Sequence, residues 1–362
     1  MTYRVIQWAT GGVGTETLRI LLDRDDVELV GVFAHSPAKV GRDAGELAGR
    51  DPIGVTATGD RNEILALDAD VVVHTALLTP EGWPQMDDDV VALLRSGKNV
   101  VSSASYFWPT AHGADYHDQF DRAAGAGGVT LYGTGMNPGL ILDRLPVTLT
   151  TLCTNVDHLR LAEIYDVSQH PSPAMLFGQM GMGQDRDQFT ADAPIGVMFR
   201  RMYGEVVTQV ANMLGAEVER VDARLNLGLA TRDLELPAGL VRKGTIAGTN
   251  WVFSAIVDGR PYVELEQNWI VDKDLPDWDT RRVWIAEIEG SPSMRLELKM
   301  VRTWGDRSLV PWYDAALHCT AAAVVHAIPE VIAAEPGVLR QPTFAPYRYG
   351  EDAGAYRPAA TV

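Results

Sequence analysis

The chain has 362 residues, of which 46% are hydrophobic, and this length and composition suit two domains with large buried cores. Its net charge of −17 makes nucleic acid and anionic membranes poor partners, and we expect neither. The two cysteines, Cys153 and Cys319, are too few for a disulfide-stabilised protein of this length and indicate a reducing, cytoplasmic location.

The first 33 residues have the pattern of one strand–helix–strand unit. Apolar runs at residues 5–8 and 29–33 predict two buried strands. Leucines at helical spacing between the two runs predict a helix: Leu18, Leu21 and Leu22. This order of elements is typical of a βαβ unit.

The turn between the first strand and the helix, residues 9–14, indicates dinucleotide binding. Ala9, Gly11 and Gly14 occupy the three positions of a G-x-G-x-x-G fingerprint, with alanine in place of the first glycine. Gly11 would let the backbone approach a pyrophosphate, Gly14 would let the helix pack close to the sheet, and the helix N-terminus would face the phosphates. We therefore predict that the whole turn binds the cofactor: Ala9, Thr10, Gly11, Gly12, Val13 and Gly14.

The end of the second strand indicates which dinucleotide is bound. NAD sites usually carry an acidic residue about 20 residues past the glycines, but no carboxylate lies between Phe33 and Arg42. Hydroxyl and basic side chains in this segment suit a 2′-phosphate, although the same residues are also typical of a solvated loop. We therefore expect NADP(H) to be preferred over NAD(H), with these further contacts: His35, Ser36, Lys39 and Arg42.

Strands continue to alternate with helices up to about residue 150. Further strands are expected at 70–76, 100–102 and 129–132, and helices at 63–67, 87–95 and 115–126. This alternation predicts an α/β fold, a Rossmann-type doubly wound parallel sheet. His74 is expected to be a buried strand residue.

Ligands of such sheets lie beyond the carboxyl ends of the strands. Thr75 and Ala76 are therefore expected beside the cofactor. The turn at 133–139, Gly-Thr-Gly-Met-Asn-Pro-Gly, is expected to close over the nicotinamide with Asn137 as its polar contact. The alternative is a structural turn that needs glycine for its backbone angles.

After about residue 150 the pattern changes to successive strands with hairpin turns. Strand-like runs occupy 159–164, 218–227, 245–257, 262–270, 283–288 and 294–301, and helices are expected at 195–214 and 315–334. Asp258-Gly259 is a hairpin turn signal, and Pro329 is expected to kink or end the last helix. These runs predict a second α/β domain with an open mixed or antiparallel sheet.

The predicted boundaries follow from these patterns. We divide the chain into a Rossmann domain at 1–150, a substrate and dimerisation domain at 151–310, a helix packing back on the Rossmann domain at 311–340, and a C-terminal tail at 341–362.

Four segments together resemble a known family: ATGGVG at 9–14, HSPAKVGRDAG at 35–45, GTGMNPGLILD at 133–143 and HCTAAAVVHAIPEV at 318–331. The chain is similar to the dihydrodipicolinate reductase-like proteins, and closest to 2,4-diaminopentanoate dehydrogenase and the native amine dehydrogenases. The resemblance runs from the first strand to about Gly337. It implies a homodimer and NAD(P)H-dependent reduction of imines or carbonyls, with ammonia as a substrate in the amine dehydrogenases. It also implies that His318, Cys319 and Thr320 face the pocket.

The chain departs from the family pattern just after the strand at 100–102, where the family carries a glutamate and residues 100–114 contain no acid. A carboxylate there would hold ammonia as ammonium and move its protons. Ser105, Tyr106 and His170 are the hydroxyl and imidazole groups available for proton transfer, with aromatic packing as the alternative for Tyr106 and a solvated loop position as the alternative for His170.

The remaining site predictions concern the substrate. We expect these residues to line its pocket: Trp108, Tyr165, Phe177 and Thr320. The histidines and cysteines are scattered without metal-ligand spacing, so no metal is expected.

These observations predict an NAD(P)H-dependent oxidoreductase that reduces a C=N or C=O bond of a mainly apolar small molecule, with ammonia as a further substrate if amine chemistry is retained. The first alternative is a carbonyl reductase that performs no amine chemistry. The second is a non-catalytic NADP(H)-binding sensor.

Overall fold

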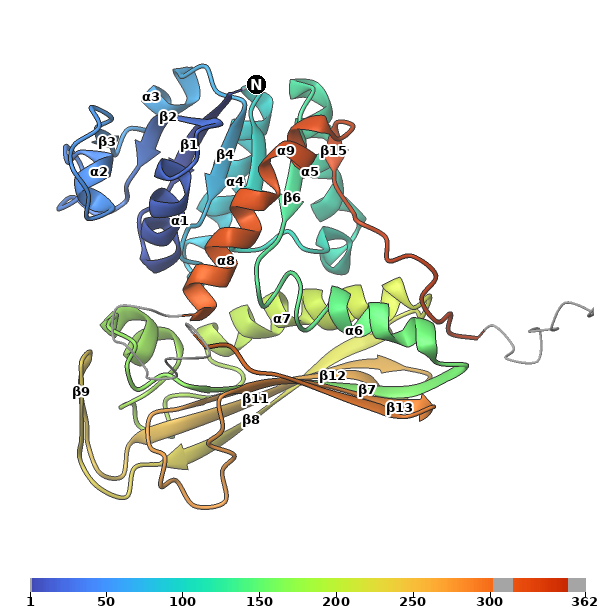
Figure 1. Cartoon of the computed structure of the whole chain (residues 1–362). Coiled ribbons are helices and arrows are strands. Elements are labelled where there is room, and N and C mark those ends of the chain that lie inside the picture. The colour runs from blue at the N-terminus through green and yellow to red at the C-terminus, as the bar shows by residue number, and fades with distance from the viewer. Residues whose placement is uncertain (1, 302–314, 351–362) are drawn as a thin grey trace, which may run out of the picture. The chain divides into compact units, whose positions relative to one another are not determined.

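The structure, a computed structural model, describes residues 2–301 and 315–350 (Figure 1). These residues form two compact units: 2–140 with 315–341, and 141–301 with 342–350. The chain passes from the first unit to the second after residue 140, earlier than the predicted boundary at 150. The reason is that α6 (Arg144–Leu149) packs with α7 (Pro194–Met213) in the second unit.

A parallel sheet of seven strands forms the centre of the first unit, in the order β15-β6-β5-β4-β1-β2-β3. The strands are β1 (Tyr3–Trp8), β2 (Val27–Phe33), β3 (Ala57–Thr58), β4 (Val71–His74), β5 (Asn99–Ser102), β6 (Thr130–Gly133) and β15 (Gly337–Val338). The helices are α1 (Gly12–Leu22), α2 (Ala44–Leu47), α3 (Arg61–Ala66), α4 (Trp83–Arg95), the 3-10 helix η1 (Pro109–His112), α5 (Ala114–Gly127), α8 (Ala315–His326) and α9 (Ile328–Ala333). The predicted Rossmann-type α/β fold is confirmed.

Helices cover both faces of this sheet. Leu18 and Leu21 of α1 share one hydrophobic core with Val324 and Val325 of α8, so α1, α8 and α9 cover one face. Helices α4 and α5 pack against each other and cover the other face. All four residues of β4 are buried, which explains why this strand is apolar without alternation.

The segment Ala315–Ala333 is apolar and long enough to cross a membrane by length and composition, with a mean hydropathy of 1.5. In the structure it contributes Val324, Ile328 and Val331 to the core of the first unit, as the core helix of a globular protein does. Pro329 lies in the first turn of α9, where the missing N–H of proline costs no hydrogen bond.

A mixed sheet of six strands forms the centre of the second unit, in the order β14-β13-β7-β12-β11-β8. The strands are β7 (Asn155–Asp166), β8 (Arg220–Leu229), β11 (Ile246–Val257), β12 (Arg260–Ile270), β13 (Val283–Ser291) and β14 (Met294–Leu298). The other elements are the 3-10 helix η2 (Thr150–Leu152), the π-helix η3 (Ala174–Gln179), and the small hairpin of β9 (Leu234–Leu236) and β10 (Gly239–Val241). Only β7 and β12 pair in parallel, so the predicted mixed sheet is confirmed.

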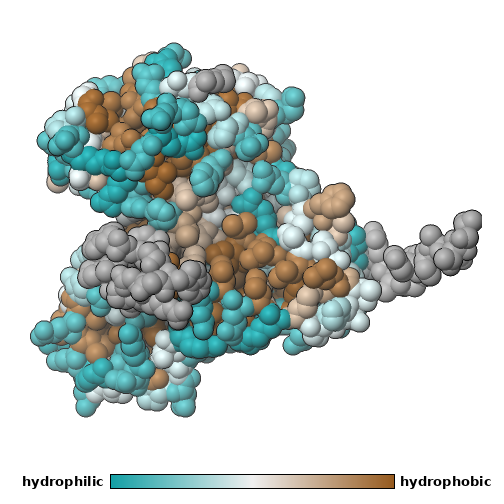
Figure 2. Space-filling view, viewed as in Figure 1, coloured by the Kyte–Doolittle hydropathy of each residue, from teal (hydrophilic) through white to brown (hydrophobic). Residues whose placement is uncertain are grey.

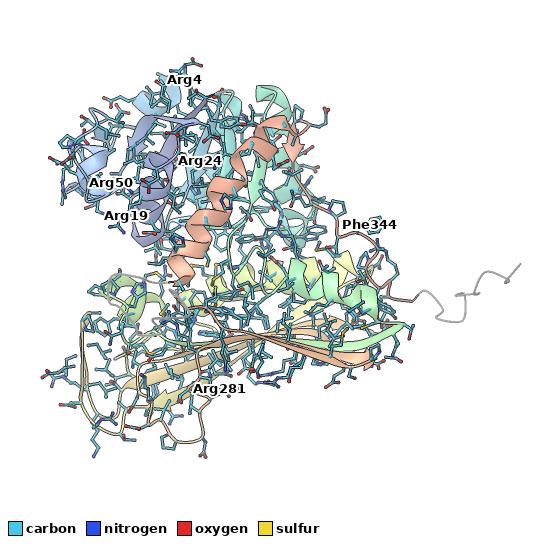
Figure 3. The ribbon with its side chains drawn as sticks, in the orientation of Figure 1. Arg4, Arg19, Arg24, Arg50, Arg281 and Phe344 are labelled. Carbon is cyan, nitrogen blue, oxygen red and sulfur yellow. The ribbon has the colours of Figure 1, made fainter. Side chains whose placement is uncertain are left out.

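The two faces of the six-stranded sheet differ in polarity. Helix α7 covers one face with rings such as Phe199, which contacts Trp251 and Trp269 at centroid distances of 5.6 and 5.7 Å. The opposite face carries ion pairs, among them Arg281 with Asp279 at 2.7 Å, and Figure 3 labels this arginine. Hydrophilic side chains are spread over the visible surface of both units (Figure 2), in keeping with the net charge of −17.

The predicted C-terminal tail is attached to the second unit over part of its length. The Tyr349 hydroxyl donates to an Asp258 carboxylate oxygen at 2.6 Å, and Arg348 donates to the Met213 carbonyl at 2.6 Å. Residues 342–350 are therefore held against the second unit. The rest of the predicted tail, 351–362, lies outside the described residues.

Candidate functional site

The segments that carry the predicted cofactor contacts meet at the carboxyl edge of the first unit's sheet. Trp8 pairs with Phe33 on one side and with His74 on the other, His74 pairs with Ser102, and Ser102 pairs with Gly133. The strands therefore end at one level, and the segments that follow them begin side by side: 9–14, 34–42, 75–80, 103–108 and 134–139. This edge is where a doubly wound sheet binds its ligand.

The glycine turn has the geometry that its sequence predicts. Ala9 has φ of +72°, so it holds the left-handed conformation for which glycine is the usual residue. A Cβ on Gly14 would lie 2.1 Å from the Ala9 carbonyl oxygen, so close packing requires glycine there. A Cβ on Gly11, the residue that caps α1, would meet no atom within 4 Å. The space beside Gly11 is open in the first unit, as backbone contact with a pyrophosphate requires.

Two polar side chains hold this turn: Gln7, which the sequence reasoning did not select, and Thr75, which it expected beside the cofactor. Gln7 is fully buried in β1, and its amide nitrogen donates to the Ala9 carbonyl and the Thr75 hydroxyl, each at 2.8 Å. The Thr75 hydroxyl also lies 3.3 Å from the Ala9 carbonyl. Thr75 therefore helps to fix the turn from the neighbouring strand. A glutamine between Ile6 and Trp8 in a buried apolar strand was the available signal.

The segment after β2 folds back onto the glycine turn. The backbone N–H of Lys39 donates to the Ser36 carbonyl at 2.9 Å, and that of Arg42 donates to the Lys39 carbonyl at 3.2 Å. The Lys39 ammonium donates to the Thr10 carbonyl, which places a positive charge at the predicted phosphate-binding turn. Burial lowers the pKa of Lys39, and the charge of Arg42 lowers it further. Ser36 and Arg42 are exposed in the same short segment.

The two histidines near this edge have lowered basicity. His74 is fully buried, its Nδ1 lies 3.0 Å from the Ser102 hydroxyl, and burial lowers its pKa to about 3. His35 packs edge-on against Phe33 at a centroid distance of 4.9 Å. Partial burial lowers the pKa of His35, although the charge of Asp89 opposes the shift. The expectation that His74 is a buried strand residue is confirmed.

Tyr106 is a buried residue with a positive φ of +73°, which is unusual for a bulky side chain. Its hydroxyl donates to Asp87 at 2.8 Å, and the Tyr116 hydroxyl donates to the same carboxylate oxygen at 2.9 Å. The Tyr106 ring also packs edge-on against Phe120 at 4.9 Å. These contacts support the aromatic-packing interpretation over the acid. Asp87 was not selected from the sequence because it lies in α4, 19 residues before Tyr106.

Two other predicted residues also follow β5. Ser105 is fully buried. Trp108 is half-buried, and the Arg340 guanidinium lies over its ring at 4.9 Å from the centroid.

The turn at 133–139 is tightly built. Gly139 has φ of +127°, and a Cβ on it would lie 2.1 Å from the Gly135 nitrogen. These features require glycine for structural reasons. The Thr320 methyl group is the nearest side-chain atom to Gly135, 3.5 Å from where its Cβ would be. Thr320 on α8 therefore borders the turn that contains Asn137.

The predicted residues of the second unit lie on and after β7. Tyr165 is buried, and its ring lies 5.5 Å from that of Trp284 and 4.2 Å from the Arg282 guanidinium. His170 follows β7 and accepts a hydrogen bond at Nδ1 from the Ser172 backbone at 3.2 Å. Phe177 lies in η3, where a Cβ on Gly239 would meet its ring at 3.1 Å.

Comparison with known proteins agrees with both halves of the fold. The family of the 2,4-diaminopentanoate dehydrogenase C-terminal domain matches residues 140–345, and that of the dihydrodipicolinate reductase N-terminus matches residues 5–101. An amine dehydrogenase of Streptomyces virginiae is 31% identical over 92% of this chain and 93% of the relative. This chain belongs to the 2,4-diaminopentanoate dehydrogenase family.

Two further relatives agree with this assignment. The 2,4-diaminopentanoate dehydrogenase of Acetoanaerobium sticklandii is 26% identical over 92% of this chain and 91% of the relative. The structure of the amine dehydrogenase from Mycobacterium smegmatis shares the fold, with a TM-score of 0.76 and 21% identity, over 95% of this chain and 99% of that one. As a member of this family, the protein is an NAD(P)-dependent oxidoreductase, and the predicted family and enzyme class are confirmed.

Two carboxylates, one in each unit, accept hydrogen bonds from aromatic side chains. Asp87 accepts hydrogen bonds from the phenols of Tyr106 and Tyr116 in the first unit. Glu163 on β7 of the second unit accepts hydrogen bonds from the indoles of Trp269 and Trp284. The sequence reasoning selected neither, because both contacts join distant parts of the chain.

Proposed function

We propose that this family member uses NADPH in preference to NADH to reduce a C=N or C=O bond of a mainly apolar small molecule, with ammonia as a further substrate in the amine-forming reaction. The observation that carries the proposal is the glycine turn, which combines open space beside Gly11 with the Lys39 ammonium at Thr10. The family assignment supports the reaction class.

The residues at the carboxyl edge fit a dinucleotide. The α1 N-terminus, the open space beside Gly11 and the bond from Gln7 to the turn suit a pyrophosphate. Lys39, with Ser36 and Arg42 in the same turn, suits a 2′-phosphate. When bound, the cofactor supplies the hydride, and the chain supplies binding and orientation.

The side chains of the second unit favour an apolar substrate. Phe199 of α7 forms one aromatic cluster with Trp251 and Trp269 of the sheet. Met180 and Met182 are also buried in this unit. Aromatic and methionine side chains of this kind line sites for bulky apolar groups.

A carbonyl reductase that performs no amine chemistry is the second candidate function. The specific observation in its favour is the absence of an acid from residues 100–114, where the family resemblance led us to expect a glutamate. Ketone reduction needs a proton donor but no group to hold ammonium.

Oxidation of NADPH and NADH by the purified protein tests the proposal, with cyclic and long-chain ketones and aldehydes, each with and without excess ammonium chloride. We expect consumption of NADPH that requires ammonium. Consumption without ammonium would favour the carbonyl reductase. If NADPH binds tightly but no compound is reduced, the protein is a sensor and the proposed activity is refuted.

We further propose that the protein is a cytoplasmic homodimer, as the family resemblance implies. Cys153 and Cys319 form no disulfide, in keeping with a reducing compartment. Light scattering of the eluting protein during size-exclusion chromatography tests the dimer, with a mass of 39.5 kDa expected for a single chain.

A further inference from the structure

Helices α1 and α8 lie side by side in the first unit (Figure 1), and the start of α8 contacts the first turns of α1. A Cβ on Gly12 would lie 3.1 Å from a methyl carbon of Leu317, so this leucine covers the glycine. Four residues further along α1, the Oε1 of Glu16 lies 2.7 Å from the Nδ1 of His318. Residues four apart share one face of a helix, so Gly12 and Glu16 present one surface to two consecutive residues of α8.

The contact between Glu16 and His318 is a directed hydrogen bond. Glu16 also accepts a hydrogen bond at Oε2 from Arg19 at 2.9 Å. Although burial favours the neutral acid, the bonds from His318 and Arg19 lower the pKa of Glu16, so its side chain is ionised at neutral pH. An ionised carboxylate only accepts hydrogen bonds, so His318 is the donor through Nδ1. Charge-assisted bonds of this kind are short and fix the orientation of both partners.

The same turn of α8 also reaches the turn at 133–139. Thr320 follows His318 by two residues, and its methyl carbon lies 3.5 Å from where a Cβ on Gly135 would be. Residues 317–320 therefore contact both the helix that begins at the glycine turn and the second turn of the carboxyl edge. The dinucleotide is expected at this edge.

The rest of α8 is anchored separately. Val324 and Val325 are fully buried and share a core with Leu18 and Leu21 of α1. Residues 316–320, in contrast, are only half-buried. Loss of one polar contact at the start of α8 therefore releases this turn and leaves the buried half of the helix folded.

We propose that His318 is a positioning residue for the dinucleotide and that it acts through Glu16. The bond between them holds the start of α8 in place before the cofactor binds, with Leu317 beside the glycine turn and Thr320 beside the turn at 133–139. Binding then carries no cost for ordering this turn, which raises the affinity. This inference rests on the dinucleotide site of the proposed function, and it holds for amine and carbonyl chemistry alike.

Three variants test the role of His318. His318→Ala removes the hydrogen-bond donor. His318→Asn keeps one, because the amide nitrogen of asparagine lies close to the position of Nδ1 in histidine. His326→Ala is the matched control, since His326 is an exposed histidine in the last turn of the same helix. Circular dichroism and thermal unfolding show whether each variant folds.

Fluorescence titrations with NADPH and with NADH measure the effect on binding. We expect His318→Ala to weaken both dinucleotides to the same degree, about tenfold, because a hydrogen bond to a charged group is lost and the 2′-phosphate is not involved. His318→Asn and His326→Ala should bind both as the wild type does. Adenosine 2′-monophosphate lacks the pyrophosphate and the nicotinamide, so calorimetry should show equal affinities for the wild type and His318→Ala.

Several outcomes would overturn the proposal. One is unchanged affinity for both dinucleotides in His318→Ala. Another is an equal loss of affinity for adenosine 2′-monophosphate, which would indicate a general loosening of the first unit. A third is binding by His318→Asn as weak as that of His318→Ala. If His318→Ala fails to fold, Leu317→Ala takes its place, with the same tenfold loss for both dinucleotides expected.

Hydrogen–deuterium exchange of the free protein gives a readout that needs no cofactor. The amides of residues 319–321 bond to the first carbonyls of α8, so they should exchange faster in His318→Ala than in the wild type. The amides of 324–326 should exchange equally in both proteins. Equal exchange at 319–321 would show that His318 does not hold the turn.

Kinetic measurements separate this inference from the proposed function. If carbonyl compounds are reduced with NADPH and His318→Ala keeps the wild-type Kd for both dinucleotides, the function stands and the role of His318 is wrong. If His318→Ala weakens both dinucleotides as expected but no compound is reduced by the wild type, the role of His318 stands and the proposed activity is wrong.

Discussion

The carbonyl oxygen of Ala9 lies 2.1 Å from the position that a Cβ on Gly14 would occupy. The Thr75 hydroxyl would lie 2.8 Å from the same Cβ, and Gln7 holds the Ala9 carbonyl from the other side. The carbonyl therefore cannot move away without breaking buried hydrogen bonds. Gly14 is required by internal packing, whereas a Cβ on Gly11 would meet no atom within 4 Å.

Alanine substitutions at these two glycines should have different effects. Gly14→Ala should destabilise the protein by about 1–3 kcal/mol because it overpacks a rigid contact. Gly11→Ala should have the same unfolding temperature as the wild type. It should bind NADPH at least tenfold more weakly, because its methyl group would occupy the space left for the pyrophosphate. Thermal unfolding and NADPH fluorescence titration measure the two effects. Equal NADPH affinity in Gly11→Ala and wild type would contradict the placement of the phosphates.

Lys39 should determine the preference between the two cofactors. Lys39→Ala removes the ammonium group beside Thr10, and a lost charge-assisted hydrogen bond to a 2′-phosphate costs about 1.5–3 kcal/mol. The Kd for NADPH should therefore rise about tenfold or more, while the Kd for NADH changes little.

Arg50→Ala is the matched control for Lys39→Ala, because Arg50 is exposed and paired with Asp23 at 2.7 Å on the outside of the first unit (Figure 3). Titrations at low and high salt should show a larger loss of NADPH affinity in the wild type than in Lys39→Ala, since salt screens the phosphate contact. A parallel loss of NADH affinity in Lys39→Ala would argue for a pyrophosphate contact instead.

Tyr106→Phe distinguishes packing from acid catalysis. The hydroxyl donates to Asp87, so its loss should destabilise the protein by about 1–3 kcal/mol while turnover stays close to that of the wild type. Tyr116→Phe removes the second hydrogen bond to the same carboxylate oxygen and should have a similar effect on stability. A fall in turnover of about 100-fold or more in Tyr106→Phe alone would show that the phenol donates a proton in the reaction.

The sequence is sufficient to predict the sheet and the glycine turn because their signals are local. Residues 9–14 follow an apolar strand and precede a helix, and such neighbouring patterns predict a βαβ unit without knowledge of distant contacts. Asp258-Gly259 likewise predicts its hairpin, in which both residues have positive φ.

The polar contacts of the site could not be predicted in the same way. Glu163 meets Trp269 and Trp284, which are 106 and 121 residues further along the chain, and only the sheet register brings them together. In the sequence, Glu163 has the appearance of a solvent-facing residue in an amphipathic strand. Gln7 gave a weak local signal, since a polar side chain in a buried strand must be hydrogen-bonded.

His74 should make stability fall at acidic pH. Burial lowers its folded-state pKa to about 3, below the ordinary value of 6.5, so between these values the unfolded chain binds a proton that the folded protein does not. The contribution of the neutral imidazole is therefore complete above about pH 6.5 and is lost as the pH falls toward 3. From pH 7 to pH 5 the loss from this one group amounts to about 2 kcal/mol.

Urea unfolding of the wild type and of His74→Asn at pH 7 and pH 5 measures this contribution. The variant should be less stable at pH 7, because it loses the packing of the ring against Trp8 and the contact with Ser102, but its stability should depend less on pH. His326→Asn, at an exposed position, should follow the wild-type pH dependence. If His74→Asn and the wild type lose the same free energy of unfolding between pH 7 and pH 5, the imidazole accepts a proton in the folded protein.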